Sequence, residues 1–303
     1  MKIIYINDEV KIENKNEYAV CLGMFDGVHI GHRELINKTV TLAKEKALKS
    51  AVLTFLRKKE KNKIYPLETK IKLIEKMGID TVFIIDFDKK FMEKSPEEFI
   101  REYLIDYIRA KEIVCGFNYR FGKNRIGDFN TLKDYEKLGY NLTVIEPVLN
   151  DGEVVSSTLI KKLLTEGNIK RANLLLGRDY LMEGIVKEGN KIGRTIKFPT
   201  VNVPVPCELI RVKAGVYASY VKIGNKKYYG LSNIGTAPTV RKSEEFISET
   251  YIINFSDDLY NKNVKIYLKE FIREERKFSS IEELKETICE NLKTAEELFE
   301  KEL

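Results

Sequence analysis

The sequence is poor in the residues that support redox, metal and membrane chemistry. Its 303 residues include no tryptophan, two histidines and four cysteines. The cysteines, Cys21, Cys115, Cys207 and Cys289, are scattered without a C-x-x-C pair, so neither a disulfide framework nor a zinc knuckle is indicated. No apolar run approaches the roughly 20 residues of a spanning helix, and residues 1–8 turn polar before a signal-peptide core can form. We therefore expect a cytoplasmic protein with no membrane partner.

The charge balance is basic but does not decide the function. Lysine and arginine number 52 against 46 acidic residues, which gives a net charge of +6. This balance fits a polyanion binder and equally an enzyme that handles small phosphates. The densest basic run, residues 57–63, is typical of a solvated loop. The 16 tyrosines are dispersed, with no aromatic platform motif beside a basic stripe. An RNA-binding function is thus the weaker interpretation, and we expect no nucleic-acid partner.

Length and hydrophobic pattern predict two domains. At about 150 residues per domain, the chain has room for two cores. In the first half, apolar strand-like runs alternate with amphipathic helical runs, which is typical of a parallel α/β sheet. We expect strands over residues 18–22, 51–55, 81–86, 113–116 and 142–145, and helices over residues 33–46, 68–77 and 96–108. The first domain, residues 1–180, is predicted to be Rossmann-like.

The pattern of the second half is different. Alternating β-branched and aromatic residues are interrupted by glycine, proline and asparagine, which predicts an antiparallel barrel or sandwich. We expect strands over residues 215–221, 227–231, 249–255 and 264–268. A final helix is predicted because apolar residues recur at spacings of three and four: Ile281, Leu284, Ile288, Leu292, Ala295 and Leu298. The second domain is predicted over residues 184–303.

Both histidines lie in one segment, residues 23–33, between a predicted strand and a predicted helix. Three glycines there allow a tight turn and a close approach to a phosphate, and a helix N-terminus offers N–H groups and partial positive charge. His29 and His32 can donate hydrogen bonds to phosphate oxygens. A metal site would need more ligands, from Asp26 or remote carboxylates. A helix start with surface histidines is a third interpretation.

The same segment carries a known signature. The pattern Gly23-x-Phe25-Asp26-Gly27-x-His29-x-Gly31-His32 contains the H-x-G-H of nucleotidyltransferases, and it closely resembles the form found in bacterial bifunctional riboflavin kinase/FAD synthetases. Further motifs follow in that family's order: residues 114–128, 156–161 and 176–178, then residues 193–202, 215–217, 233–239, 249, 259–260 and 273–278. The resemblance spans nearly the whole chain, and it is specific because many short motifs keep their order and spacing.

The resemblance implies two consecutive reactions on one flavin. A β-barrel riboflavin kinase domain with a C-terminal helix would phosphorylate riboflavin with ATP to give FMN. The Rossmann-like nucleotidyltransferase domain would then adenylylate FMN, giving FAD and pyrophosphate. Riboflavin, FMN and ATP would be the small-molecule partners, with Mg²⁺ as cofactor.

The resemblance also assigns residues in the first domain. His29 and His32 would be catalytic, because they would hydrogen-bond the phosphates of ATP as charge moves to the leaving pyrophosphate. Nucleotide contacts are expected from Gly23, Phe25, Asp26, Gly31, Ser156, Ser157, Thr158 and Lys161, and flavin contacts from Asn118 and Arg120. Residues 156–158 precede a helical run, so simple N-capping is the alternative for them. A loop stabilised by side-chain hydrogen bonds is the alternative at residues 118 and 120.

In the second domain, Glu249 resembles the family's catalytic glutamate, which would accept the proton of the attacking ribityl hydroxyl. Thr200 and Asn202 would supply oxygen ligands to Mg²⁺. The remaining expectations are nucleotide contacts from Gly189, Gly193 and Arg194 and flavin contacts from Asn233 and Arg273. The alternative for Glu249 is a strand residue that faces solvent. The alternative for residues 198–202 is an edge strand that carries a proline.

The chain departs from the family pattern at four places. Leu56-Arg57-Lys58-Lys59 stands where an acidic residue and Pro-His-Pro are usual. Lys161 replaces a common arginine, which keeps the charge but loses its bidentate fork. Lys197 replaces a glycine, and Val201 an alanine. Two functional alternatives stay open: one of the two activities alone, or a nucleotidyltransferase for another phosphorylated metabolite.

Overall fold

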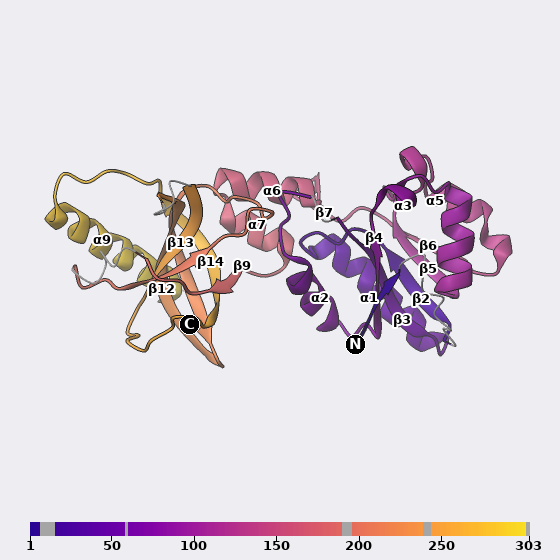
Figure 1. Cartoon of the computed structure of the whole chain (residues 1–303), viewed down its shortest axis with the longest axis horizontal. Helices are drawn as coiled ribbons and strands as arrows, with labels where there is room; N and C mark the ends of the chain where they lie inside the picture. Colours follow the sequence, from indigo (N-terminus) through magenta and orange to yellow (C-terminus); the bar gives the residue numbers. More distant parts are fainter. Residues whose placement is uncertain (7–15, 58–59, 190–195, 239–243, 301–303) are drawn as a thin grey trace. The chain divides into compact units, whose positions relative to one another are not determined.

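A computed structural model of the chain describes residues 1–6, 16–57, 60–189, 196–238 and 244–300 (Figure 1). The chain divides into two compact units, Met1–Ser157 and Thr158–Leu303. Each unit contains one six-stranded sheet. The boundary expected from the sequence, at residues 180–184, lies within β9 (Tyr180–Ile185), a strand of the second sheet.

All strands of the unit 1 sheet run parallel, in the order β1-β4-β3-β2-β5-β6. They are β1 (Lys2–Ile6), β2 (Tyr18–Leu22), β3 (Lys49–Leu56), β4 (Thr81–Asp86), β5 (Ala110–Gly116) and β6 (Asn141–Ile145). Strand β2 is buried along its whole length, as a central strand covered on both faces should be. The five strands predicted here are confirmed, and β1 adds a sixth at the edge.

Helices cover both faces of this sheet. On one face, α1 (Ile30–Glu45) and α2 (Leu67–Glu75) bury apolar side chains such as Ile36 and Ile74. On the other face, the π-helix η1 (Phe99–Tyr107) buries Phe99 in a separate core cluster. The shorter elements are α3 (Lys89–Met92), α4 (Pro96–Glu98), η2 (Lys123–Arg125), α5 (Phe129–Asp134), η3 (Glu136–Leu138), β7 (Leu149–Asn150) and β8 (Glu153–Val154). The predicted Rossmann-like α/β class is confirmed.

The helix predicted over residues 96–108 consists of a capped first turn and a π-helical run. Ser95 Oγ accepts the Glu98 N–H, and the Glu98 carboxylate accepts the Ser95 N–H, which together satisfy two donors at the helix start. From Phe99 the helix widens to the π form. Apolar periodicity does not distinguish this form from an α-helix, so the sequence predicted the segment but not its type.

The unit 2 sheet is antiparallel, in the order β10-β13-β12-β11-β14-β9. Its other strands are β10 (Thr200–Pro204), β11 (Gly215–Ile223), β12 (Lys226–Pro238), β13 (Glu244–Ile252) and β14 (Asn263–Arg273). The two edge strands approach each other: the Lys187 N–H donates to the Asn202 carbonyl at 2.8 Å, and a Cβ at Gly184 would lie 2.7 Å from Val203 Cγ1. The sheet therefore curls into a half-barrel, which confirms the antiparallel prediction.

Four hydroxyl groups form a row in the interior of the half-barrel. Ser219 bonds Ser232 at 2.8 Å, Ser232 bonds Thr250 at 2.7 Å, and Thr250 bonds Ser248 at 3.1 Å. All four side chains are fully buried. Each hydroxyl thus finds its partner on the same or a neighbouring strand, which offsets the cost of burying it.

Helices pack on the outside of the second sheet (Figure 1). The C-terminal helix α9 (Ile281–Glu300) buries Ala295 and Phe299 against Val216, Ala218 and Leu231 of β11 and β12. This confirms the predicted final helix. Helix α6 (Ser157–Glu166) and α7 (Ile169–Leu176) precede β9.

Helix α7 is tied to two strands of the half-barrel. The Asn173 side chain donates to the Leu268 carbonyl at 2.8 Å and accepts the Tyr180 N–H at 2.7 Å. Strands β9 and β10 were not predicted as strands, although an edge strand at residues 198–202 was the stated alternative. Among the described residues, no helix is long and apolar enough to cross a membrane.

Candidate active sites

The first candidate site lies where the strand order of unit 1 reverses. From β2 the chain moves outward through β3 and β4, then returns to place β5 on the other side of β2. Because the strands are parallel, the loops after β2 and β5 leave the same edge of the sheet, on either side of this reversal. Ligands of open α/β sheets bind at such a switch point.

The loop after β2, residues 23–29, has a backbone suited to a bound phosphate. Phe25, Gly27 and Val28 all have positive φ (52°, 81° and 43°), an arrangement that folds the loop tightly before helix α1. Phe25 is fully buried and anchors the turn. A Cβ at Gly31 would lie 3.2 Å from the His29 ring, so a larger residue there would require the ring to shift by a few tenths of an ångström.

The two histidines stack on each other. Their ring centroids are 3.6 Å apart at an interplanar angle of 21°. His29 is the N-cap of α1, and its Nδ1 accepts the His32 N–H at 3.3 Å. This bond places the proton of the neutral His29 ring on Nε2, where it can donate. The structure therefore brings both predicted catalytic histidines together at a helix N-terminus. Among the described residues, no group of three His, Cys, Asp or Glu side chains could hold a metal ion.

Asp26 holds the loop in place. Its Oδ1 accepts the Ile64 N–H at 2.9 Å, and its carbonyl accepts the Ser157 hydroxyl at 2.8 Å. Ser157 begins helix α6, so the helix starts within residues 156–158 and not after them as expected, and the Ser157 hydroxyl bonds the loop. Ser156 precedes the helix, while Thr158 and Lys161 lie on it in unit 2. The nucleotide contacts of these residues stay predictions.

The loop after β5 carries Asn118 and Arg120, both exposed. The Arg120 guanidinium donates to the Tyr119 carbonyl at 3.1 Å and pairs with Asp128 at 3.7 Å. Backbone bonds between Phe121 and Gly127 close the loop. The loop thus presents polar side chains at the second side of the switch point, where a flavin phosphate was predicted.

The second candidate site is a row of side chains across unit 2. Strand register places Arg273, Val216, Asn233, Glu249 and Asn202 side by side on β14, β11, β12, β13 and β10. Directly opposite residues of antiparallel strands share a face. Val216 packs under α9, so this row lies on the outer face that the helix partly covers. Four residues predicted for the kinase reaction therefore come together.

Asn202 and Thr200 share this face at the end of the row, two residues apart on β10. Asn202 Oδ1 is buried and has no hydrogen-bond partner within the described part of the chain. A buried oxygen of this kind fits a ligand to a hard cation. Gly189 lies against the Asn202 amide, since a Cβ there would be 2.5 Å from Nδ2. Gly193 and Arg194 lie outside the described residues.

Glu249 is half-buried beside a second carboxylate. Burial raises the pKa of Glu249, and the charge of Glu275 raises it further. Glu275 accepts from the Asn233 amide at 3.3 Å and lies over Gly235, where a Cβ would meet its Oε1 at 2.3 Å. A raised pKa makes a carboxylate a stronger proton acceptor. Glu275 lies within the motif of residues 273–278, but no role of its own was predicted for it; its contact with Asn233 is formed by the segment that follows β14.

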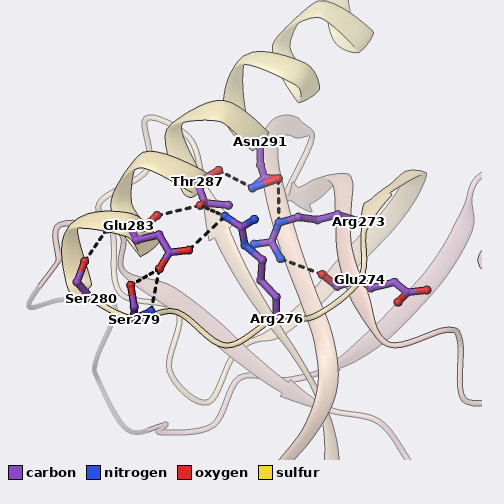
Figure 2. A network of polar contacts seen from close by, with 8 residues as sticks. All are labelled: Arg273, Glu274, Arg276, Ser279, Ser280, Glu283, Thr287 and Asn291. Carbon is purple, nitrogen blue, oxygen red and sulfur yellow. Dashed lines mark hydrogen bonds and ion pairs between the residues drawn. The ribbon is translucent and has the colours of Figure 1, made fainter.

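Helix α9 fixes the end of the row (Figure 2). Arg273 Nε donates to Asn291 Oδ1 at 3.2 Å, and Arg276 donates to the Thr287 hydroxyl at 2.6 Å. Arg276 also pairs with Glu283 at 3.9 Å. Burial and the neighbouring Arg276 lower the pKa of Arg273. The helix thus holds both arginines of residues 273–278 from one side.

A cavity of about 440 Å³ opens beside Thr200. Its walls are apolar side chains with a carboxylate pair at residues 257–258, and they include Val186, Pro199, Phe255, Leu259 and Tyr260. The volume is that of a small-molecule site. Its wall comes from three separate segments. The sequence motifs include residues 199–201 and 259–260 of this wall, and the strand predicted over residues 249–255 includes Ile252 and Phe255.

Comparisons with known proteins match each half of the chain to an enzyme family. The FAD synthetase family model matches residues 11–159, and the riboflavin kinase family model matches residues 176–299. Three curated proteins named bifunctional riboflavin kinase/FMN adenylyltransferase match nearly end to end. The Bacillus subtilis protein is 35% identical over 95% of both chains. The Listeria monocytogenes protein is 33% identical over 94% of both chains. The Escherichia coli K12 protein is 34% identical over 93% of this chain and 92% of its own.

This chain belongs to the bifunctional riboflavin kinase/FMN adenylyltransferase family. A solved structure from Streptococcus pneumoniae, named a macrolide-efflux protein, matches with a TM-score of 0.86 and 30% identity over 98% of each chain. The family's two enzyme domains correspond to the two sheets described above. The resemblance inferred from short motifs is confirmed over nearly the full length.

Proposed function

We propose that the chain phosphorylates riboflavin to FMN at the row on unit 2 and adenylylates FMN to FAD at the loop after β2. The observation that carries this proposal is the match of one enzyme family model to each half of the chain, each half having its own cluster of polar side chains. ATP is the co-substrate of both reactions.

In the adenylyl transfer, an oxygen of the FMN phosphate attacks the α-phosphorus of ATP. The bond to the β-phosphate breaks, and pyrophosphate leaves. The nucleophile is already anionic at pH 7, so no general base is required and catalysis consists of positioning and charge stabilisation. His29 and His32 donate to the phosphate oxygens, with the N-terminus of α1 beneath them. Asn118 and Arg120 contact the flavin phosphate.

In the kinase reaction, a ribityl hydroxyl attacks the γ-phosphorus of ATP and ADP leaves. The hydroxyl is neutral at pH 7, so Glu249 accepts its proton. Thr200 and Asn202 would hold Mg²⁺, and the buried Asn202 Oδ1 supports this assignment. When bound, Mg²⁺ neutralises charge on the phosphates. The cavity beside Thr200 takes the nucleoside of ATP, while Asn233 and Arg273 contact the flavin.

The test is a time course with purified protein, riboflavin, ATP and Mg²⁺, with flavins separated by chromatography. FMN should appear first and FAD second, and FMN supplied with ATP should give FAD directly. Formation of FMN without FAD would mean that the chain retains only the riboflavin kinase activity. FAD from neither substrate would favour a nucleotidyltransferase for another phosphorylated metabolite. A cytoplasmic location stays a prediction.

A further inference from the structure

A buried lysine lies directly beneath the loop that carries the histidines. Lys70 is on helix α2, and its side chain is only 8% exposed. Its Nζ donates to the Met24 carbonyl at 3.0 Å and to the Thr54 hydroxyl at 2.9 Å. Lysine is rarely buried unless its charge serves a partner.

These contacts form a closed triangle. The Thr54 hydroxyl itself donates to the Met24 carbonyl at 3.1 Å. Thr54 is fully buried on β3, the strand beside β2. Met24 is followed by Phe25, where the backbone enters the positive-φ turn. The ammonium group is therefore hydrogen-bonded to the carbonyl at which the loop leaves the sheet.

Lys70 also faces the carboxylate of the loop. Lys70 and Asp26 line one cavity of about 30 Å³, enough for a water molecule. Burial lowers the pKa of Lys70 to about 8, although the charges of Asp26 and Glu60 raise it. The other charged or titratable groups lining this cavity are Lys63, which lowers the pKa further, Arg57 and Tyr65.

We propose that Lys70 is a positioning residue for adenylyl transfer: its ammonium group holds the Met24 carbonyl and balances the Asp26 carboxylate, so that the loop can receive the phosphates of ATP. This inference rests on the proposed function of unit 1. A carboxylate in a phosphate-binding loop repels the ligand unless a cation lies beside it. Arg57 and Lys63 also line this cavity, and Lys70 donates directly to the Met24 carbonyl of the loop backbone.

The proposal has a consequence in pH. As the pH rises through about 8, Lys70 loses its proton, and its positive charge no longer compensates the negative charge of Asp26. Adenylyl transfer should then weaken, mainly through a higher KM for ATP. The kinase reaction uses groups of unit 2, so the rate of FMN formation by the same preparation is a control for correctly folded protein.

The experiment compares the wild-type chain with Lys70→Met, Lys70→Arg and Lys72→Met in FAD formation from FMN and ATP at pH 7 and pH 9.5. Lys72 is an exposed lysine of the same helix and is the matched control. Lys70→Met should lower kcat/KM for ATP about 10- to 100-fold at pH 7, because small displacements of a positioned group have effects of this size. Lys72→Met should stay within twofold of wild type. The ratio of the wild-type kcat/KM for ATP to that of Lys70→Met should be smaller at pH 9.5 than at pH 7. Lys70→Arg stays charged, so its kcat/KM should not fall between pH 7 and pH 9.5.

The outcomes separate this inference from the proposed function. Wild-type protein that makes no FAD overturns the proposed function itself. Wild-type protein that makes FAD, with Lys70→Met within twofold at pH 7, overturns the role of Lys70. A loss of equal size at pH 7 and pH 9.5 also overturns it, because it would reflect packing alone. If circular dichroism shows that Lys70→Met does not fold, the test uses wild type and Lys70→Arg alone. A fall in kcat/KM for ATP between pH 7 and pH 9.5 that both proteins share overturns the proposal. A fall in wild type that is absent from Lys70→Arg supports it.

Discussion

His29 is fixed by its own helix, whereas His32 is held by stacking on His29 and by Phe25, whose ring centroid lies 5.2 Å away. Removing both imidazoles should therefore remove the phosphate donors without emptying the core. We expect His29→Ala/His32→Ala to lower FAD formation about 10²- to 10³-fold or more, the usual cost of losing a preorganised donor. FMN formation by the same preparation should continue. Unchanged FAD synthesis would contradict the assignment, and both products are measured by chromatography.

Glu249 is predicted to act as a base, which glutamine cannot do. Glu249→Gln keeps the size and hydrogen bonding of the side chain, so a kinase loss of about 10²- to 10⁴-fold is expected from the missing proton acceptor alone. Glu245→Gln, on the same strand, is the control and should leave the kinase rate unchanged. Adenylylation of supplied FMN should persist in both variants. A kinase rate within a few-fold of wild type would remove Glu249 from the mechanism.

The buried Lys70 should also leave a signature in stability. Its pKa is lower in the folded chain, about 8, than the 10.5 of the free side chain. The unfolded chain therefore binds the extra proton, and wild-type stability rises with pH between 8 and 10.5. Lys70→Met has no such dependence. Relative to wild type, the variant should lose roughly 2–3 kcal/mol of unfolding free energy between pH 7 and pH 10.

Urea unfolding followed by circular dichroism tests this, since the chain has no tryptophan. Parallel curves for wild type and Lys70→Met at both pH values would show that the pKa of Lys70 is close to that of an exposed lysine. Lys72→Met should follow the wild-type curve.

At the residue scale, the sequence predicted a site residue where its type is rare in the chain or where it lies in a short local motif. The two histidines could be found because no others exist, and Glu249 because neighbouring motifs framed it. Lys70 and Glu275 could not be found in the same way. Lys70 is one of 52 basic residues, and the only local signal is that it falls on the apolar stripe of its helix with Leu67 and Ile74. Glu275 meets Asn233 across 42 positions of sequence.

At the element scale, helix α9 contacts the row of side chains proposed for the kinase reaction. Asn291 is buried, and its amide oxygen is the acceptor for Arg273 Nε (Figure 2). Asn291→Leu should free the Arg273 side chain and raise the KM for riboflavin about 5- to 30-fold, the equivalent of roughly 1–2 kcal/mol for one charged hydrogen bond. Asn291→Asp retains an acceptor and should bind riboflavin nearly as well as wild type. Equal KM values in all three proteins would exclude a role for this contact.

The elements that the sequence missed share a physical cause. Strand β1 lies at the sheet edge and buries Ile4 and Ile6 while it exposes Ile3 and Tyr5, so its burial alternates but its residue types are apolar on both faces. Strands β9 and β10 are edges of the half-barrel, where glycine and proline interrupt the β signal. Central strands such as β2 and β11 were predictable because burial dictates nearly every residue in them.

At the scale of the whole molecule, the chain should be separable into two enzymes. A fragment of residues 158–303 contains the complete second sheet, α7 and the kinase row. It should fold and phosphorylate riboflavin while making no FAD. A fragment of residues 184–303 lacks residues 180–183 of β9 and the Asn173 bonds to β9 and β14, and it should be less stable.

Thermal unfolding and FMN formation distinguish these fragments. A folded but inactive 158–303 fragment, with the full chain active, would mean that the kinase site takes groups from unit 1. Equal stability of the two fragments would support the domain boundary predicted from the sequence, at residues 180–184. It would also mean that α6 and α7 do not contribute to the folding of the second domain.

The buried hydroxyl row of the half-barrel restricts how this part of the chain can diverge. The hydroxyls of Ser219, Ser232, Thr250 and Ser248 are linked in that order, and each contact can run in either direction. Ser219→Ala leaves Ser232 bonded to Thr250, whereas Thr250→Ala removes the hydroxyl that Ser248 bonds, at a cost of about 1–3 kcal/mol. Exchanging all four for apolar side chains of similar shape leaves no hydroxyl without its partner. Combinatorial libraries at the four positions should therefore return few variants that combine an apolar residue at position 250 with Ser248.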